Sequence, residues 1–217
     1  MKQIVVAVDG PAGAGKSTIC KIVARKLNLE YIDTGAMYRA LTLKVINNNI
    51  SVNDIEKIMN ILEETKIDLI SGKVYLDNRD VSEDVRTPIV SENVASIAKI
   101  GSVRDKLVYM QQCMAGEKSV IMDGRDIGTR VLINASTKIY LTASVEERAE
   151  RRYTEFIEKG LEVNLEDVIN DIKERDRVDM TREVTPLCQA KDAILVDTTS
   201  KSINQVVDEI ISLIEGR

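Results

Sequence analysis

A glycine-rich segment near the start of the chain constrains the fold more than any other feature of the sequence. It reads Gly10-Pro11-Ala12-Gly13-Ala14-Gly15-Lys16-Ser17 and follows the β-branched run Ile4–Val8. Such a run is typical of a strand buried on both faces of a sheet. The glycines let backbone N–H groups turn inward around phosphate oxygens, and a following helix directs its positive N-terminal end at the same anion. The segment therefore predicts a phosphate-binding loop between a strand and a helix.

The side chains at the end of this loop match the chemistry of a bound nucleoside triphosphate. Lys16 can reach the β- and γ-phosphates, and the Ser17 hydroxyl can bind Mg²⁺. A second apolar run, Val120–Asp123, ends in a carboxylate. An acidic residue at the end of a strand can lie near the water shell of the metal ion. Together the two segments predict a site for a nucleoside triphosphate and magnesium, with Ser17 as the metal ligand.

Strand and helix patterns alternate along the rest of the chain, which predicts an α/β fold with a parallel sheet. The predicted strands are Ile4–Val8, Tyr31–Ile32, Ser119–Met122, Lys138–Leu141 and Ala193–Val196. The predicted helices are Lys16–Leu27, Ala36–Ile46, Asn53–Glu64, Pro88–Ile100, Val103–Ala115, one beginning at Ser144, one from Asn164 to about Asp179, and one beginning at Ser202. Two alternating runs, Lys66–Ser71 and Lys73–Asp77, flank Gly72 and predict a hairpin in an inserted lobe.

Several residues are expected to cap these helices. Thr34 can cap the helix that follows the second strand. Asn164 can cap the helix that runs to about Asp179. Two segments, Ser144–Glu147 and Ser202–Gln205, match the capping box in which the first and fourth residues bond to each other's backbone.

Composition excludes several classes of function. The 217 residues suggest one domain with insertions, and the net charge of −5 argues against a strongly basic surface for a nucleic acid polymer. Histidine is absent, which excludes Ser-His-Asp and Cys-His catalysis and every histidine metal site. Cys20, Cys113 and Cys188 are far apart, which favours reduced thiols in a cytoplasmic protein. No apolar run approaches the ~18 residues of a membrane span.

Clusters of arginine and aspartate are the remaining candidates for a site. Arg125 and Asp126 follow a predicted strand, where ligands bind in parallel sheets, so that Arg125 can fork onto a phosphate and Asp126 can accept from an amino group. On a continuing helix, Arg175, Asp179 and Arg182 would share one face. A solvated helix surface that carries an ion pair has the same pattern. Arg148, Arg151 and Arg152 can meet phosphate charge or pair with neighbouring glutamates, and the pattern leaves open which of them touches the nucleotide.

Four segments in order resemble the bacterial cytidylate kinases along nearly the whole chain. They are Asp9–Thr18, Thr34–Arg39, Asp123–Thr129 and Lys173–Arg177. The resemblance implies a sheet core of the P-loop NTPase type flanked by helices, with an inserted NMP-binding lobe that holds a small antiparallel sheet, and a short lid. The implied bounds in one kinase domain, 1–217, are a core at about 1–48, 88–150 and 180–217, an insert at about 49–87 and a lid at about 151–179.

The same resemblance implies an activity and a role for each site residue. The implied reaction moves the γ-phosphoryl of ATP to CMP or dCMP, with Mg²⁺, in a cytoplasmic monomer that binds neither a membrane nor a nucleic acid polymer. The ATP-binding residues would be Gly10, Pro11, Ala12, Gly13, Ala14, Gly15, Lys16, Ser17 and Thr18. The substrate-binding residues would be Thr34, Arg39, Ser96, Arg104, Arg125, Asp126, Arg175 and Asp179. The catalytic residues would be Lys16, Arg125, Arg175 and Arg182, and Arg177 has no assigned role.

Within that set the implied roles differ. Arg39 and Arg125 would hold the CMP phosphate, while Arg175 and Asp179 would contact the sugar. Ser96, Arg104 and Asp126 would contact the cytosine, whose amino donor and ring acceptors suit a carboxylate and an arginine. Two alternatives remain open at this point. One is another NMP kinase, of the UMP/CMP type, and the other is a nucleotide-dependent switch without kinase activity.

Overall fold

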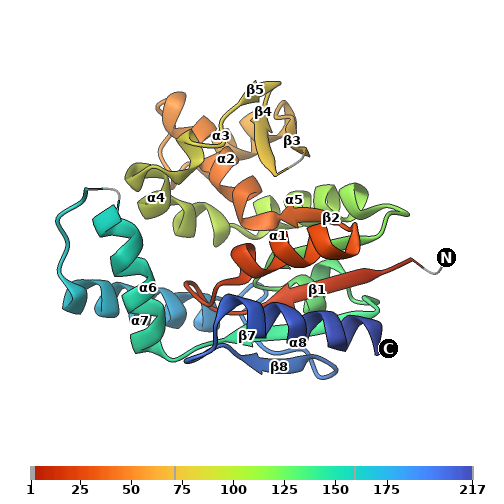
Figure 1. The fold of residues 1–217 in the computed structure, drawn as a ribbon. Helices are drawn as coiled ribbons and strands as arrows, with labels where there is room; N and C mark the ends of the chain where they lie inside the picture. Colours follow the sequence, from red (N-terminus) through yellow and green to blue (C-terminus); the bar gives the residue numbers. More distant parts are fainter. Residues whose placement is uncertain (1–2, 71, 159, 217) are drawn as a thin grey trace. The chain divides into compact units, whose positions relative to one another are not determined.

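A computed structural model describes residues 3–70, 72–158 and 160–216 of the chain. Their packing forms two compact units, shown in Figure 1. The first comprises Met1–Leu29 and Lys118–Arg217, and the second comprises Glu30–Glu117. Ser71, which the sequence placed in the predicted hairpin, and Lys159, in the predicted lid, lie outside the described residues.

The first unit is built on a parallel sheet, as the sequence predicted. Its strands are β1 (Val5–Asp9), β6 (Val120–Gly124), β7 (Thr137–Thr142) and β8 (Ile194–Asp197). They lie in the order β6-β1-β7-β8, and each neighbouring pair is parallel. β1 lies between β6 and β7. Its residues Val6, Ala7 and Val8 are completely buried, as expected for an apolar strand with neighbours on both edges.

Helices cover this sheet and continue the chain between its strands. They are α1 (Lys16–Leu27), α6 (Val145–Glu158), α7 (Leu165–Thr181) and α8 (Ile203–Glu215), with a π-helical turn at Ile127–Val131. α1 and α8 pack side by side, and α1 also contacts β1 and β6 (Figure 1). α1 ends at Leu27, and its C-cap Asn28 has a left-handed backbone and donates its N–H to the Ala24 carbonyl.

Local capping signals set the start of three helices. The Ser202 hydroxyl accepts from Gln205 N–H while the Gln205 side chain accepts from Ser202 N–H, which confirms that capping box. Ser144 accepts from the backbone of Glu147, and Asn164 accepts from the backbone of Glu166. α6 and α7 then pack on each other through their own small core, which is built on Ala149, Val168 and Ile172.

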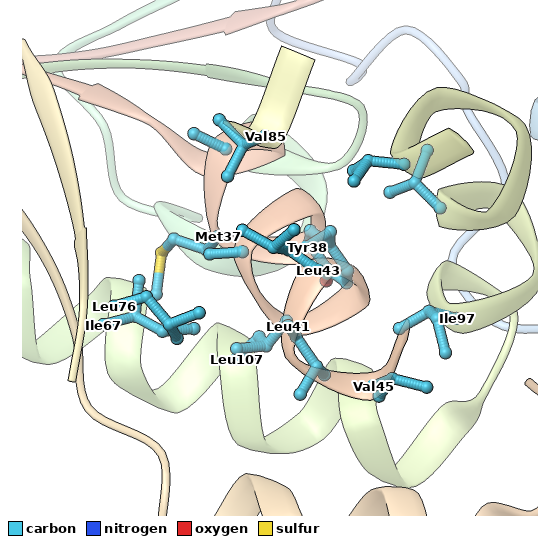
Figure 2. Packing of buried hydrophobic residues seen from close by; sticks show 14 of the residues in the cluster. Met37, Tyr38, Leu41, Leu43, Val45, Ile67, Leu76, Val85, Ile97 and Leu107 are labelled. Atoms are coloured by element: carbon cyan, nitrogen blue, oxygen red, sulfur yellow. The ribbon is translucent and has the colours of Figure 1, made fainter. Parts of the chain in front are cut away.

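The second unit is mostly helical. Its elements are β2 (Glu30–Asp33), α2 (Thr34–Asn47), α3 (Ile55–Glu63), β3 (Ile67–Ile70), β4 (Lys73–Leu76), β5 (Arg79–Asp80), a 3₁₀ turn (Asp84–Arg86), α4 (Pro88–Ala98) and α5 (Gly101–Ala115). α2 lies at the centre of its core. Met37, Tyr38 and Leu41 of α2 belong to one buried cluster with Ile97 of α4 and Leu107 of α5, and Figure 2 labels all five.

A small antiparallel sheet confirms the predicted hairpin. β3 pairs with β4 from Ile67 opposite Leu76 to Ile70 opposite Lys73, and β4 pairs with β5. Asp77 and Asn78 connect β4 to β5 with positive φ values of 49° and 69°. These are the backbone angles that a tight hairpin turn needs, and Asp and Asn tolerate them better than most residues. Lys44 of α2 holds this turn through a 2.7 Å ion pair with Asp77.

In the described part of the chain, no helix is both long enough and apolar enough to cross a bilayer.

We predict that Leu107→Ala lowers the free energy of unfolding by about 2 to 5 kcal/mol, because it leaves a cavity at a completely buried position. Chemical denaturation followed by circular dichroism measures the change. Tyr109→Ala on the same helix is the control, since Tyr109 is 64% exposed, and it should change stability by no more than about 0.5 kcal/mol. Equal losses in the two variants would contradict the assigned core.

Candidate active site

The register of the sheet places two loops of the first unit side by side. Asp9, the last residue of β1, lies opposite Gly124 of β6, and Val8 lies opposite Asp123. Because the strands are parallel, both chains leave the sheet at the same edge. The loop that begins at Gly10 therefore starts next to the segment that carries Arg125 and Asp126, and polar side chains of both gather where parallel sheets bind ligands.

The phosphate loop begins with an unusually close approach of backbone to backbone. A Cβ atom at Gly10 would lie 1.9 Å from the Leu141 carbonyl oxygen, and φ at Gly10 is 148°. Only glycine fits there. The loop then passes into α1 at Gly15, and within residues 10–18 no side chain caps that helix. Its first N–H groups can therefore serve a bound phosphate, as the sequence predicted.

Lys16 is folded back onto its own loop. Its Nζ donates to the carbonyls of Gly10 and Pro11, at 2.7 Å each, and the residue is only 6% exposed. Burial, and after it the positive charge of Arg125, lower the pKa of Lys16 to about 7, although Asp123 and Asp9 act in the opposite direction. The lysine is thus desolvated beside a loop shaped for anions, where a phosphate would favour its charged form.

Ser17 and Asp123 meet as a magnesium site of this type requires. The Ser17 hydroxyl donates to the Asp123 carboxylate over 3.0 Å, and Asp123 is 4% exposed. Mg²⁺ takes oxygen ligands, and in nucleotide enzymes one or two come from the protein while substrate phosphates and waters supply the others. The described residues hold no group of three or more His, Cys, Asp or Glu that could bind a metal alone. This pair of oxygens fits a magnesium ion brought with the nucleotide.

Asp9 organises the loop that follows β6, and sequence reasoning gave it no role. Its carboxylate accepts from the backbone N–H groups of Ile127 and Gly128, at 2.7 and 2.8 Å. Burial raises the pKa of Asp9 to about 6, although these two N–H groups lower it. The carboxylate thereby fixes the π-helical turn that follows Arg125 and Asp126. Its position directly before Gly10, at the end of a buried strand, was the signal that could have indicated it.

Arg125, Asp179 and Arg182 form an ion cluster. Arg125 Nε donates to Asp179 over 2.8 Å, and Arg182 Nη1 lies 3.7 Å from the same carboxylate. Burial raises the pKa of Asp179, but Arg125, Arg175 and Arg182 outweigh it, so the net pKa is lowered. For Arg125, burial lowers the pKa, but the nearby carboxylates, Asp179 foremost, outweigh this effect, so the net pKa is raised. The structure thus gathers all three predicted arginines of this unit around one carboxylate.

α7 does not continue as far as Arg182, in agreement with the predicted end of this helix near Asp179. α7 ends at Thr181, and Arg182 has extended backbone angles of −63° and 142°. It nevertheless reaches Asp179, and its Nε donates to the Thr185 carbonyl over 2.6 Å. The shared helix face therefore holds only for Arg175 and Asp179, and Arg182 reaches the cluster from the segment after the helix.

In the second unit, α2 carries two of the predicted residues. Asp33, and not Thr34 as predicted, caps this helix, since its Oδ1 accepts from Ala36 N–H. Asp33 Oδ2 also pairs with Arg39 over 2.9 Å. Arg39 Nε is buried and has no hydrogen-bond partner among the described residues. Thr34 is 3% exposed in the first turn of the helix.

Ser96 and Arg104 lie on the helices that pack near α2. Ser96 is half-buried on α4, and Arg104 on α5 is only 2% exposed. Arg104 donates to the Ala98 carbonyl over 3.0 Å and lies over the Tyr38 ring, 5.3 Å from its centroid. α2, α4 and α5 all contact one another. The elements that carry the four predicted residues of this unit are therefore packed together.

The three arginines that the sequence could not tell apart have different surroundings. Arg148 is buried and contacts the phosphate loop at Ala12. Arg151 donates to the Thr198 hydroxyl and carbonyl and to Glu147. Arg152 pairs with Glu155 and lies over the Phe156 ring, 4.7 Å from its centroid.

Comparison with known proteins gives the family. A sequence model described as "Cytidylate kinase" matches residues 6–216. The cytidylate kinase of Caldicellulosiruptor saccharolyticus is 52% identical over 217 residues, which cover 98% of this chain and 96% of that one. The cytidylate kinase of Clostridioides difficile is 50% identical over 214 residues and 99% of both chains.

Among solved structures, an uncharacterized protein from Eubacterium ventriosum shares the fold. Its TM-score is 0.56 at 14% identity, over 99% of this chain and 100% of that one. At that identity the likeness concerns the fold alone. The family assignment depends instead on the sequence match, which includes the phosphate loop, the Asp123–Thr129 segment and α7. The chain belongs to the cytidylate kinase family.

Proposed function

We propose that this chain transfers the γ-phosphoryl group of ATP to CMP, giving CDP and ADP, and that dCMP is a second acceptor. The proposal is supported by relatives named cytidylate kinase at 52% and 50% identity over nearly the whole chain. The observation that carries it is the geometry of the phosphate loop. Lys16 is buried against the loop carbonyls, and the Ser17 hydroxyl donates to Asp123. These groups suit a triphosphate and its metal ion.

ATP would be held by residues 10–18 through backbone N–H groups, with Lys16 on the β- and γ-phosphates. To reach them, Lys16 must exchange its two bonds to the Gly10 and Pro11 carbonyls for phosphate oxygens. Ser17, with Asp123 beside it, would hold Mg²⁺. When bound, this ion would supply positive charge that offsets the negative charge developing on the phosphates.

CMP would be held by arginines around its phosphate and by polar groups around its base. We assign the phosphate to Arg39 and Arg125, the sugar to Arg175 and Asp179, and the cytosine to Ser96, Arg104 and Asp126, with Thr34 as a further contact. Arg125 and Arg39 are each held by a carboxylate, at 2.8 and 2.9 Å. A dianionic phosphate can compete for both guanidinium groups, which keep their charge when desolvated.

Little covalent chemistry is asked of the protein. A phosphate monoester has a second pKa near about 6, so the acceptor is largely dianionic at neutral pH and needs no general base. Positioning and neutralisation of charge supply most of the rate in such transfers. Lys16, Arg125, Arg175 and Arg182 would supply the positive charge, and the absence of histidine from the sequence is compatible with this chemistry.

The remaining properties belong to the same proposal. We place the enzyme in the cytoplasm, where its three cysteines, all free thiols, would remain reduced. We expect a monomer that binds small nucleotides and neither a nucleic acid polymer nor a membrane. A kinase of the UMP/CMP type would differ only in its acceptor. A nucleotide-dependent switch would instead release ADP from ATP at a rate that CMP does not change.

The choice of acceptor gives a direct test of the proposed reaction. Coupled ADP production screened over CMP, dCMP, UMP, AMP, GMP and dTMP should show turnover that requires an acceptor and is greatest with CMP or dCMP. UMP would present a carbonyl to the Asp126 carboxylate, which we expect to lower kcat/KM by roughly 5- to 150-fold. Asp126→Asn, which can donate to that carbonyl, should narrow the gap. Equal kcat/KM for CMP and UMP in the wild type would contradict the assigned role of Asp126.

The proposed role of Arg175 in transfer predicts a loss of turnover when it is removed. Arg175→Ala should lower kcat/KM by on the order of 100-fold, because a positive charge near the transferred group is lost. Arg175 is exposed, so the melting temperature should move by less than about 3 °C. The control is Arg177→Ala on the same helix, where Arg177 is exposed and bonds to Glu174. If both variants turn over at the wild-type rate, Arg175 has no part in transfer.

The lowered pKa of Lys16 predicts that ATP binding is accompanied by proton uptake. With a free-state pKa of about 7 the side chain is mostly neutral at pH 8, and the phosphates of ATP raise that pKa on binding. Binding at pH 8 should therefore take up protons, and the uptake should fall as the pH is lowered to 6, where the free side chain is already mostly charged. Calorimetry in buffers of different ionisation enthalpy measures the uptake.

Lys16→Arg is the control for this measurement, because arginine stays charged throughout this range. It reports any protons that come from ATP itself. Equal uptake at pH 8 by the wild type and by Lys16→Arg would contradict a lowered pKa at Lys16.

A further inference from the structure

Arg148 is the most deeply buried of the three arginines on α6, and its guanidinium group contacts three partners. Its Nε donates to the Ala143 carbonyl over 3.0 Å, its Nη1 donates to the Ala12 carbonyl over 3.1 Å, and its Nη2 forms a 2.7 Å ion pair with Asp176. The residue is 4% exposed. These bonds connect the start of α6, the phosphate loop and the middle of α7, all within the first unit.

The bond to Ala12 has a direct consequence for the phosphate loop. In a planar trans peptide the C=O of one residue and the N–H of the next point in opposite directions. When the Ala12 carbonyl points at Arg148, the N–H of Gly13 therefore points away from it. Lys16 holds the Gly10 and Pro11 carbonyls in the same manner. Three consecutive carbonyls of the loop thus accept from buried cations, and the Gly13 N–H is oriented before any ligand arrives.

Packing makes the contact between Arg148 and the loop tight. A Cβ at Gly13 would lie 3.1 Å from the Arg148 Cβ and 3.2 Å from the Arg148 carbonyl oxygen, and φ at Gly13 is 76°. The loop therefore rests against the backbone of α6 as well as on the guanidinium group. Glycine satisfies both the space and the backbone angle at this position.

Asp176 holds Arg148 through the ion pair between them. It is 9% exposed, and one of its oxygens bonds to Arg148. Its other oxygen, Oδ1, is buried and has no hydrogen-bond partner among the described residues. A buried carboxylate with one bond is held in place mainly by that bond, since leaving it unpaired would be costly. Asp176 directly follows Arg175, so the same turn of α7 carries a proposed catalytic arginine and the partner of Arg148.

We propose that Arg148 and Asp176 are positioning residues for ATP, which fix the Ala12–Gly13 peptide so that the Gly13 N–H faces the phosphates. Lys16 must leave its carbonyls when ATP binds, whereas Arg148 stays on Ala12 in both states. The inference depends on the proposed use of ATP. It concerns affinity for the nucleotide, and neither residue touches the reacting atoms.

The test measures binding and turnover in the full chain. Arg148→Lys keeps the charge but cannot bond in three fixed directions. We expect it to raise the Kd for ATP by about 10-fold, to leave the Kd for CMP within about 2-fold and to keep kcat at saturating ATP within about 3-fold. Asp176→Asn should raise the Kd for ATP by about 3-fold, because its amide oxygen still accepts from Arg148.

The double variant separates a common action from two independent ones. Because Asp176 acts through Arg148, Arg148→Lys with Asp176→Asn should bind ATP no more weakly than Arg148→Lys alone. The matched controls are Glu174→Gln and Arg177→Ala, which alter the exposed ion pair next to Asp176 on α7. Both should bind ATP as the wild type does.

Three results would overturn the proposal: wild-type affinity for ATP in Arg148→Lys, equal loss of ATP and CMP binding in that variant, or additive losses in the double variant. If Arg148→Lys does not fold, Asp176→Asn decides, and an unchanged Kd for ATP overturns the proposal. A wild-type protein that fails to bind ATP would instead overturn the proposed function, and this outcome is distinct from the others.

Discussion

The buried carboxylate of Asp9 is the constraint on which the first unit's site depends. It ends the central strand, precedes the glycine that opens the phosphate loop, and accepts from the N–H groups of Ile127 and Gly128. One side chain therefore fixes the distance between the loop for the triphosphate and the turn after Arg125. Burial disfavours the charged carboxylate and raises its pKa to about 6. The two N–H bonds and the nearby Lys16 act in the opposite direction and stabilise the charged form.

In each unit, candidate cations already have partners of opposite charge or polarity. Arg125 bonds to Asp179, Arg39 bonds to Asp33, and Lys16 bonds to two loop carbonyls. Such pairs hold the side chains in place without substrate, and a phosphate must compete with the existing partner. Binding then becomes an exchange of acceptors around fixed cations, which costs less reorganisation than ordering free side chains would. Arg148 differs because its acceptors include the loop that binds the phosphate.

Much of this fold could be predicted because its signals are local. The helix bounds Lys16–Leu27 agree with the structure residue for residue, and the hairpin and the Ser202 capping box are confirmed. Where prediction failed, neighbouring residues competed for one role. Asp33 and Thr34 are both good caps, and the structure uses Asp33, which also reaches Arg39. The end of α7, predicted at about Asp179, lies at Thr181.

The sequence by itself determined the phosphate loop, the parallel α/β unit and the family, since each depends on spacing within a few residues or on motifs in order. Only the tertiary structure decided which arginine meets which carboxylate. Arg148, Arg151 and Arg152 have equivalent surroundings in sequence, yet Arg148 alone bonds to a carbonyl 136 positions away. Helical periodicity fixes the face on which a side chain lies, but its partner depends on which distant element packs there. That packing is set by the register of the sheet and the burial of the core.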